Sequence, residues 1–151
     1  KGAKQSDTDK QALREAESGL IPDPDLLRAR LLFDGGYYDK AFATLRDKAA
    51  VYASSEERFQ LEYAYRMGRI AHKLERFADA EKHYRQTIQN GQKSPTHYAC
   101  NAALQLGEMY EQQQKNAAAR DAYRQCLRIA PEDYAAALHA RAKAGLARLE
   151  K

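Results

Sequence analysis

The sequence predicts an all-α protein, and its composition and apolar spacing carry this prediction. Its 151 residues include 28 alanines but a single valine, Val51, and four isoleucines. Alanine is the best helix former, whereas sheets favour β-branched and aromatic residues. The aromatic residues recur at helical spacings of three and four. With 44% hydrophobic and 30% charged residues, the protein is not a disordered tail, and no apolar run approaches the ~20 residues of a membrane-spanning helix.

A repeat with a constant offset of 39 residues organises the sequence. The stretches GYYDKAFATL, ERFADAEKHY and QKNAAARDAY begin at residues 36, 75 and 114 and align without gaps. Small residues share one aligned position and large apolar residues share another: Ala41, Ala80 and Ala119, then Leu45, Tyr84 and Tyr123. Such a period is typical of stacked repeats. Each unit has two apolar runs at helical spacing, so we expect three antiparallel helical hairpins.

The N-terminal segment, residues 1–21, is expected to hold one short helix over Thr8–Ser18 that ends at Gly19 and Pro22. We interpret it as the remnant of a preceding repeat, because the sequence begins at Lys1 rather than at a methionine. This interpretation places part of the protein before Lys1. The sequence therefore does not indicate a compartment, cytoplasmic or periplasmic.

The hairpins are predicted at about 22–54, 55–93 and 94–131. Turn and cap signals mark their ends: Gly35–Gly36 after the first leading helix, a capping box over Ser54–Glu57, a C-cap at Asn90–Gly91, Ser94–Pro95 at the start of the third unit, and Pro131 at its end. Gly68 and Gly107 share one aligned position inside helices, where glycine costs about 1 kcal/mol relative to alanine. A cost repeated at one position predicts close helix–helix contact there.

Residues 132–151 are predicted to form a C-terminal capping helix, which makes about eight helices in all. One face of the stretch from Tyr134 to Leu149 is apolar and the opposite face is basic: Leu138, Ala142, Gly145 and Leu149 against His139, Arg141, Lys143 and Arg148. Repeat arrays need such an end helix because its polar face meets water.

The repeat pattern resembles the tetratricopeptide repeat family. The third unit carries the family's leucine–glycine pair, aromatic positions, small residue and proline: Leu106-Gly107, Tyr110, Ala119, Tyr123 and Pro131. The second unit matches with Met67-Gly68, Phe77, Ala80 and Tyr84. The first unit departs from the pattern, since Ala29 stands where glycine is expected, and the period is 39 rather than the usual 34 residues. The resemblance covers about residues 25–131 and implies an α-solenoid with a long-period repeat, of the kind common in bacterial repeat proteins.

The resemblance implies a non-enzymatic scaffold for protein–protein contact, which binds a peptide or a partner helix in the groove of the leading helices. The expected groove residues are Arg30, Phe33, Tyr65, Arg66, Arg69, His72, Lys73, Asn101 and Gln105. The middle unit supplies two arginines and a lysine to this face, and guanidinium groups suit carboxylates. We therefore expect the partner to present an acidic peptide or a C-terminal carboxylate.

No catalytic, cofactor-binding or metal-binding motif is found in the sequence. Phosphate-binding glycine loops and the zinc-protease helix motif are missing, and the four histidines have no mutual metal-ligand spacing. We expect these histidines to face solvent. Cys100 and Cys126 lie at the start and the end of opposite helices of the third hairpin, an arrangement that allows them to be neighbours. We expect two inert, half-buried thiols, with a disulfide as the alternative.

Three alternatives to a peptide-binding scaffold stay open. A net charge of +4 and a pI near 9.0 permit a weak nucleic-acid-binding helical repeat, although no basic stripe runs through all three units. The sequence also fits a regulatory or substrate-presenting module of a larger protein whose activity lies before Lys1. A third alternative is self-association through one leading-helix face.

Overall fold

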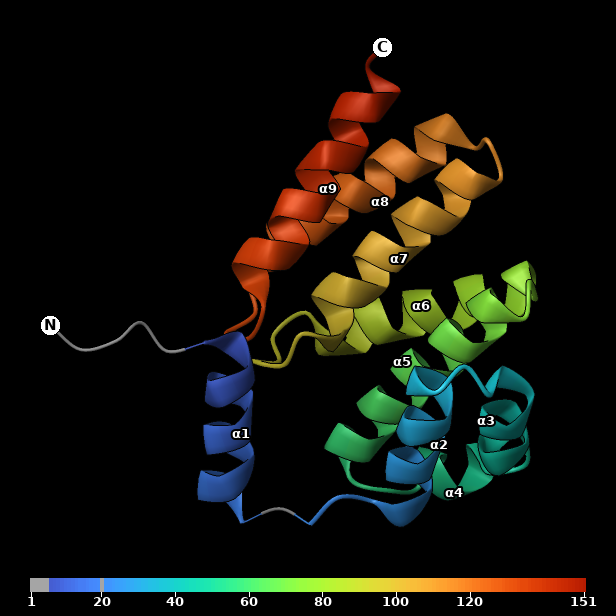
Figure 1. The fold of residues 1–151 in the computed structure, drawn as a ribbon, viewed down its shortest axis with the longest axis vertical. Coiled ribbons are helices and arrows are strands. Elements are labelled where there is room, and N and C mark those ends of the chain that lie inside the picture. The colour runs from blue at the N-terminus through green and yellow to red at the C-terminus, as the bar shows by residue number, and fades with distance from the viewer. Residues whose placement is uncertain (1–5, 20) are drawn as a thin grey trace, which may run out of the picture.

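The computed structural model describes residues 6–19 and 21–151, and every regular element in these ranges is a helix (Figure 1). The helices are α1 (Asp7–Ser18), α2 (Pro24–Asp34), α3 (Tyr38–Leu45), α4 (Ala49–Ala53), α5 (Glu57–Lys73), α6 (Phe77–Gly91), α7 (Tyr98–Gln112), α8 (Asn116–Arg128) and α9 (Ala135–Leu149). The all-α prediction is therefore confirmed. The structure adds α4, a short helix in the connection between the first two hairpins, to the eight that the sequence predicts.

Residues 1–5 and 20 belong to the predicted N-terminal segment 1–21 and lie outside the described residues. Within the part of the protein that the structure describes, no helix is both long enough and apolar enough to cross a membrane.

Consecutive helices pair into hairpins, and the hairpins stack into an α-solenoid (Figure 1). The pairs are α2 with α3, α5 with α6, and α7 with α8. The leading helices α2, α5 and α7 also contact one another in sequence, and α9 packs on both α7 and α8. Helix α9 thus takes the place of a fourth leading helix. The unit boundaries at 22–54, 55–93 and 94–131 stay a prediction.

The three hairpin turns share one geometry. Each leading helix is followed by a left-handed residue, at Gly36 (φ 83°), Glu75 (φ 57°) and Gln114 (φ 61°). The next backbone N–H then bonds back into the helix: Tyr37 N to Leu32 O at 2.8 Å, Arg76 N to Ala71 O at 2.9 Å, and Lys115 N to Tyr110 O at 2.8 Å. This is a Schellman motif, which satisfies carbonyl groups at the helix end. The turn recurs at the 39-residue offset seen in the sequence.

Three glycines inside helices pack directly against tyrosine rings from neighbouring helices. A Cβ at Gly68 would lie 2.7 Å from Tyr84 Cδ1, and one at Gly107 would lie 2.6 Å from Tyr123 Cδ1. Gly145 of α9 faces another edge of Tyr123, where a Cβ would lie 2.5 Å from Cε2. Real Cβ atoms essentially never approach so closely, so a side chain at these positions would force the helices apart. The close helix–helix contact predicted at Gly68 and Gly107 is confirmed.

The predicted capping box over Ser54–Glu57 is wrong. Helix α5 begins at Glu57, and no side chain caps its N-terminus with a hydrogen bond. The hydroxyls of Ser54 and Ser55 instead donate to carbonyls of α4, and Ser55 Oγ lies 2.7 Å from Val51 O. The two serines therefore close the preceding helix α4, because α5 begins only at Glu57 and its N-cap position is Glu56.

Two further predicted helix ends are also wrong. Helix α7 begins at Tyr98 rather than at Pro95, since the hydroxyl of Ser94 bonds locally with Thr96 in a separate turn. Gly91 lies inside α6 and does not cap it. Its small size serves packing, because a Cβ there would lie 2.8 Å from Leu61 Cδ1 on α5.

The core is an extended seam in two parts. The first part joins α2, α3 and α4 to one side of α5, with Leu26, Leu45, Tyr52 and Ile70 among its buried residues. The second part runs from α5 to α9, with α7 at its centre. Because the leading helices bury one side against their trailing partners, their other side is free to form a shared surface.

Candidate partner-binding groove

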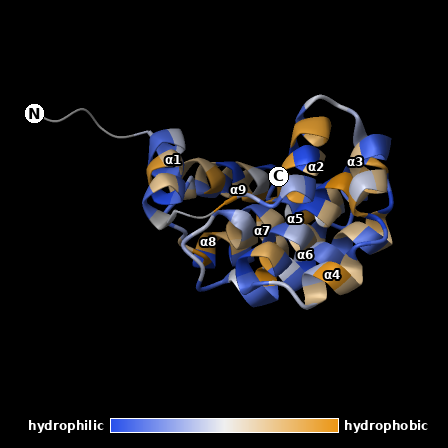
Figure 2. Cartoon of the chain, turned by 90° about the horizontal axis from the view of Figure 1, so that it is seen from below, coloured by the Kyte–Doolittle hydropathy of each residue, from blue (hydrophilic) through white to orange (hydrophobic). Residues whose placement is uncertain are grey.

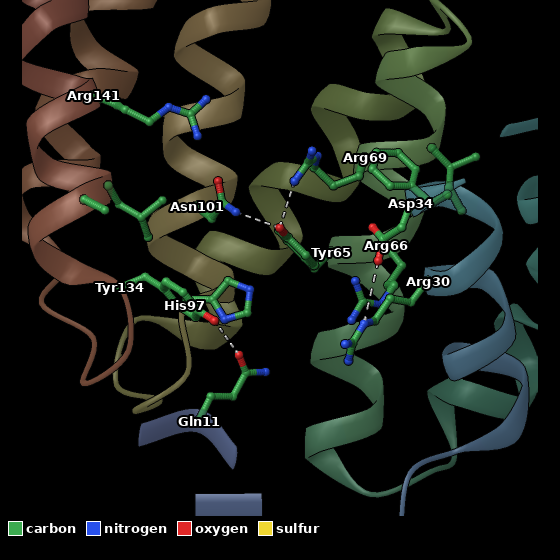
Figure 3. A pocket seen from close by; sticks show the side chains of 14 residues that line it. Gln11, Arg30, Asp34, Tyr65, Arg66, Arg69, His97, Asn101, Tyr134 and Arg141 are labelled. Carbon is green, nitrogen blue, oxygen red and sulfur yellow. Dashed lines mark hydrogen bonds and ion pairs between the residues drawn. The ribbon is translucent and has the colours of Figure 1, made fainter. Parts of the chain in front are cut away.

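The shared face of the leading helices holds a pocket of about 410 Å³ (Figure 3). Its lining comes from α2 (Arg30, Phe33, Asp34), α5 (Tyr65, Arg66, Arg69, Ile70), the start of α7 (His97, Asn101), the start of α9 (Tyr134, Ala137, Leu138, Arg141) and Gln11 of α1. This volume lies within the range of about 300–1,000 Å³ found for ligand sites. The pocket thus draws on five helices that are distant in sequence.

Six of the nine predicted groove residues line this pocket: Arg30, Phe33, Tyr65, Arg66, Arg69 and Asn101. The other three lie elsewhere. His72 contacts the trailing helix, with Nδ1 3.1 Å from the Tyr84 hydroxyl. Lys73 is exposed above the Tyr38 ring, and Gln105 is buried, at 7% exposed, with its amide donating to Asn101. The structure therefore brings six of the predicted residues together at this pocket and places the other three outside it.

Tyr65 forms the floor of the pocket and not its solvent face, so its predicted exposure is wrong. Its side chain is only 3% exposed. Its hydroxyl accepts hydrogen bonds from Arg69 Nη1 at 3.0 Å and from Asn101 Nδ2 at 2.7 Å (Figure 3). Burial of a tyrosine ring requires a partner for the hydroxyl, and here the partners are groove residues from α5 and α7. The tyrosine therefore fixes the two polar groups that face the pocket.

Four arginines surround the pocket, and Asp34 is the acidic residue of its lining. Arg66 pairs with Glu62 at 2.9 Å, Arg141 pairs with Glu108 at 2.6 Å, and Arg30 lies 4.0 Å from Asp34. The lining therefore carries an excess of positive charge. Arg66 and Glu62 are only 16% and 22% exposed, whereas Arg141 is 52% exposed. Because exposed ion pairs contribute little, Arg141 can exchange Glu108 for another carboxylate at small cost.

Arg69 lies at the centre of the arginine group. Its guanidinium lies 5.0 Å from the centre of the Phe33 ring and donates to the Tyr65 hydroxyl. No carboxylate of the described residues lies within ion-pair distance of it. The aromatic stack and the hydrogen bond hold the guanidinium in place while part of its donor set stays unused. Arg69 therefore keeps N–H donors that no described residue uses.

His97 packs within an aromatic group at the pocket, with its ring tilted or edge-on to its neighbours. Its ring centre lies 4.6 Å from that of Tyr98, 5.3 Å from that of Tyr134 and 5.7 Å from that of Tyr65. Burial, with the nearby Arg66 charge, lowers its pKa to about 4. The imidazole is therefore neutral at pH 7 and adds no positive charge to the groove.

The expectation that the histidines face solvent is wrong for all four, since each is half-buried. Burial also lowers the pKa of His72 and of His83. His139 Nε2 lies 2.7 Å from the Ile129 carbonyl oxygen. The histidines lie between helices because the helical faces that carry them are covered by neighbouring units, which spacing within one helix does not reveal.

Cys100 and Cys126 are neighbours, with their sulfur atoms 3.4 Å apart, but they are fully buried rather than half-buried. Both are free thiols. The described residues contain no group of three or more histidine, cysteine or acidic side chains placed to hold a metal ion. The pocket lining offers arginine, amide and aromatic groups, and this chemistry suits recognition of an anionic group.

Eight residues of the pocket lining are not among the groove residues that the sequence predicts. Arg141 and Tyr134 come from the region predicted to be a solvating cap, and Gln11 and His97 come from α1 and from the residue before α7. The sequence holds one signal for Arg141. Extending the 39-residue offset by one further unit aligns Arg141 with Ala102, which lies inside a leading helix. The contribution of Gln11 leaves no such signal, because α1 lies outside the repeat.

Comparison with protein families agrees with this geometry. Residues 60–132 match the family model described as tetratricopeptide repeat. The match supports a tetratricopeptide repeat family for this part of the protein. The match covers α6, α7, α8 and most of α5, so the tetratricopeptide repeats supply the floor of the pocket. No curated protein and no solved structure matches the sequence.

Tetratricopeptide repeats generally mediate contact between proteins and are typically non-enzymatic scaffolds. Their stacked leading helices create extended concave binding surfaces. In this protein the corresponding surface contains the arginine-lined pocket.

Proposed function

We propose that this protein is a non-enzymatic scaffold whose arginine-lined pocket receives an acidic segment of a partner protein. The observation that carries the proposal is the convergence of Arg30, Arg66, Arg69 and Arg141 from three leading helices on one pocket (Figure 3). Guanidinium groups bind carboxylates through paired, charge-assisted hydrogen bonds, which are about twice as strong as neutral ones. A partner with acidic side chains or a free C-terminal carboxylate matches this lining.

The pocket favours a peptide over a nucleic acid. The four arginines line one pocket instead of forming a line along the array. Single-stranded nucleic acids are bound by a basic track with exposed aromatic rings on which bases stack. The central aromatic ring of this pocket, Tyr65, is buried and uses its hydroxyl to hold Arg69 and Asn101.

The proposal is tested with a short fluorescent glutamate-rich peptide and its glutamine counterpart, by anisotropy against increasing protein concentration. Charge reversal of Arg66 and Arg69 to glutamate should weaken binding of the glutamate peptide by roughly a hundredfold or more, because two attractive contacts become repulsive. The glutamine peptide should bind weakly to every form. Free and amidated C-termini on the same peptide distinguish recognition of side-chain carboxylates from recognition of the terminal carboxylate.

Arg66 and Arg69 contact other groove residues, so substitutions there also affect the structure. A second pair of substitutions with a smaller structural effect is therefore tested as well. Arg30→Ala with Arg141→Ala should weaken binding of the glutamate peptide by roughly tenfold or more. Arg124→Ala on α8 is the matched control, because its side chain is 53% exposed and that of Arg141 is 52% exposed. Circular dichroism checks folding. Equal affinity for the two peptides, or tighter binding of a single-stranded oligonucleotide than of the glutamate peptide, would refute the proposal.

A further inference from the structure

Helix α1 lies apart from the helical stack and touches it mainly through polar groups. It stands beside the start of α9, and α2 lies on the other side of the molecule (Figures 1 and 2). Its half-buried side chains are Asp7, Lys10, Gln11 and Arg14, all of them polar. Leu13, its largest apolar residue, is 47% exposed. Apolar burial therefore contributes little to the attachment of α1.

The attachment centres on the loop between α8 and α9. Arg14 Nη2 lies 2.8 Å from Glu132 Oε2 and 3.0 Å from Asp133 Oδ1. The Tyr134 hydroxyl donates to Gln11 Oε1 at 3.0 Å (Figure 3). The loop itself is fixed from the other side, because Glu132 N donates to the Pro95 carbonyl oxygen at 2.9 Å. The acceptors for Arg14 are therefore built into the solenoid.

Asp133 requires a cation in this position. Its side chain is only 2% exposed, and Arg14 is its ion-pair partner among the described residues. A buried carboxylate without a counter-charge strongly destabilises the folded state. Arg14 is nevertheless an imperfect match, since its Nε is buried without a hydrogen-bond partner. An arginine approaching at another angle can satisfy the same carboxylates and more of its own donors.

Helix α1 also covers a second cavity of about 210 Å³. Gln11, Arg14 and Glu15 form one wall, and apolar surface from Leu27, Phe59 and Tyr98 forms the opposite side. This cavity shares Gln11, Arg30, Arg66 and His97 with the first pocket, so the two are adjacent. Departure of α1 would open the second cavity along its length and leave the Glu132–Asp133 carboxylates without a cation.

The geometry points to the surface under α1 as a second docking site, where a partner helix that carries an arginine displaces α1 and pairs with Glu132 and Asp133. Charge complementarity selects the occupant, because the resident group is itself a guanidinium between two carboxylates. This site recognises a cation, whereas the arginine-lined pocket recognises an anion. The inference therefore does not depend on the proposed acidic ligand.

The experiment uses the full-length sequence and a fluorescent peptide with the sequence of residues 7–18, together with the same peptide carrying alanine in place of its arginine. Arg14→Ala in the protein should bind the arginine peptide at least about tenfold more tightly than the unchanged protein does, since the resident arginine no longer competes. The alanine peptide should bind neither form. The protein that combines Arg14→Ala with Asp133→Asn should no longer bind the arginine peptide.

A second variant, Arg14→Gln, repeats the measurement in case the alanine variant folds poorly, and thermal melts by circular dichroism compare all forms. A concentration-dependent dimer of the unchanged protein that Arg14→Ala abolishes would support the same site, with the arginine of a second copy as the occupant. Equal binding of the two peptides, equal binding to unchanged and Arg14→Ala protein, or retained binding after Asp133→Asn would overturn the inference. The glutamate peptide, tested in parallel, reports separately on the arginine-lined pocket.

Discussion

At the scale of single residues, the closest helix contacts depend on glycine meeting tyrosine. Tyr123 lies between Gly107 of α7 and Gly145 of α9, and its hydroxyl donates to Glu111 Oε2 at 2.6 Å. Glycine normally lowers helix stability relative to alanine by about 1 kcal/mol. Here the Tyr123 ring fills the volume that an alanine methyl group would take, so glycine is favoured over alanine at these positions.

Gly107→Ala should therefore lower the free energy of unfolding by about 1–3 kcal/mol, because overpacking outweighs the gain in helix propensity. Chemical denaturation measures this change. Tyr123→Leu in the same protein should remove much of the penalty of Gly107→Ala, since the ring that causes the clash is gone. Additive effects of the two substitutions would show that the contact does not limit the helix spacing.

At the scale of elements, the hairpin turns show which local feature the repeat preserves. All three use a left-handed residue, but glycine occupies this position only at Gly36. Glu75 and Gln114 adopt the same conformation at an energetic cost, because their Cβ crowds the backbone. The turn geometry is thus set by the packing of the helices it joins, and the residue at the turn adapts to it.

Glu75→Gly and Gln114→Gly should each raise the free energy of unfolding by about 0.5–1 kcal/mol, as relief of the left-handed strain exceeds the added freedom of the unfolded state. Gly36→Ala is the opposite substitution at the equivalent turn and should lower stability by about 1 kcal/mol. Urea unfolding of the three variants provides the comparison. Destabilisation by both glycine substitutions would mean that the native side chains contribute more than their strain costs.

At the scale of the whole molecule, the divided core indicates that stability is local. Helices α2, α3 and α4 share one buried cluster with part of α5, and α7 lies at the centre of the other. In stacked repeats each unit contacts mainly its neighbours, so stability is approximately a sum of unit and interface contributions. The groove spans both parts, so binding of a partner would couple them.

Leu45→Ala removes a fully buried side chain of the first cluster. This substitution should lower the free energy of unfolding of that part by about 2–5 kcal/mol. Amide hydrogen exchange should then accelerate in α2, α3 and α4 while α7 and α8 keep their protection. Leu104→Ala, at an equally buried position of α7, should accelerate exchange in the second part. Uniform acceleration throughout the protein in both variants would show a single cooperative unit.

Much of this architecture is contained in the sequence. The alanine excess and apolar spacing determine an all-α protein, and the 39-residue offset determines which residues are equivalent. Gly68 and Gly107 mark close contacts because a repeated helix-weakening residue has a local physical reason. Arg66 and Arg69 are placed on the groove because three-residue spacing puts both on one helical face.

Only the tertiary structure decided how those faces combine. Spacing within a helix determines which residues share one helical face. Whether that face is buried depends on helices that are far away in the sequence. Tyr65 is buried because α7 lies against α5, and Arg141 reaches the groove because α9 continues the stack of leading helices. The docking of Arg14 on Asp133 joins residues 119 positions apart. A polar contact of this kind leaves no periodic pattern in the sequence, because it joins two individual residues and does not repeat along the helices.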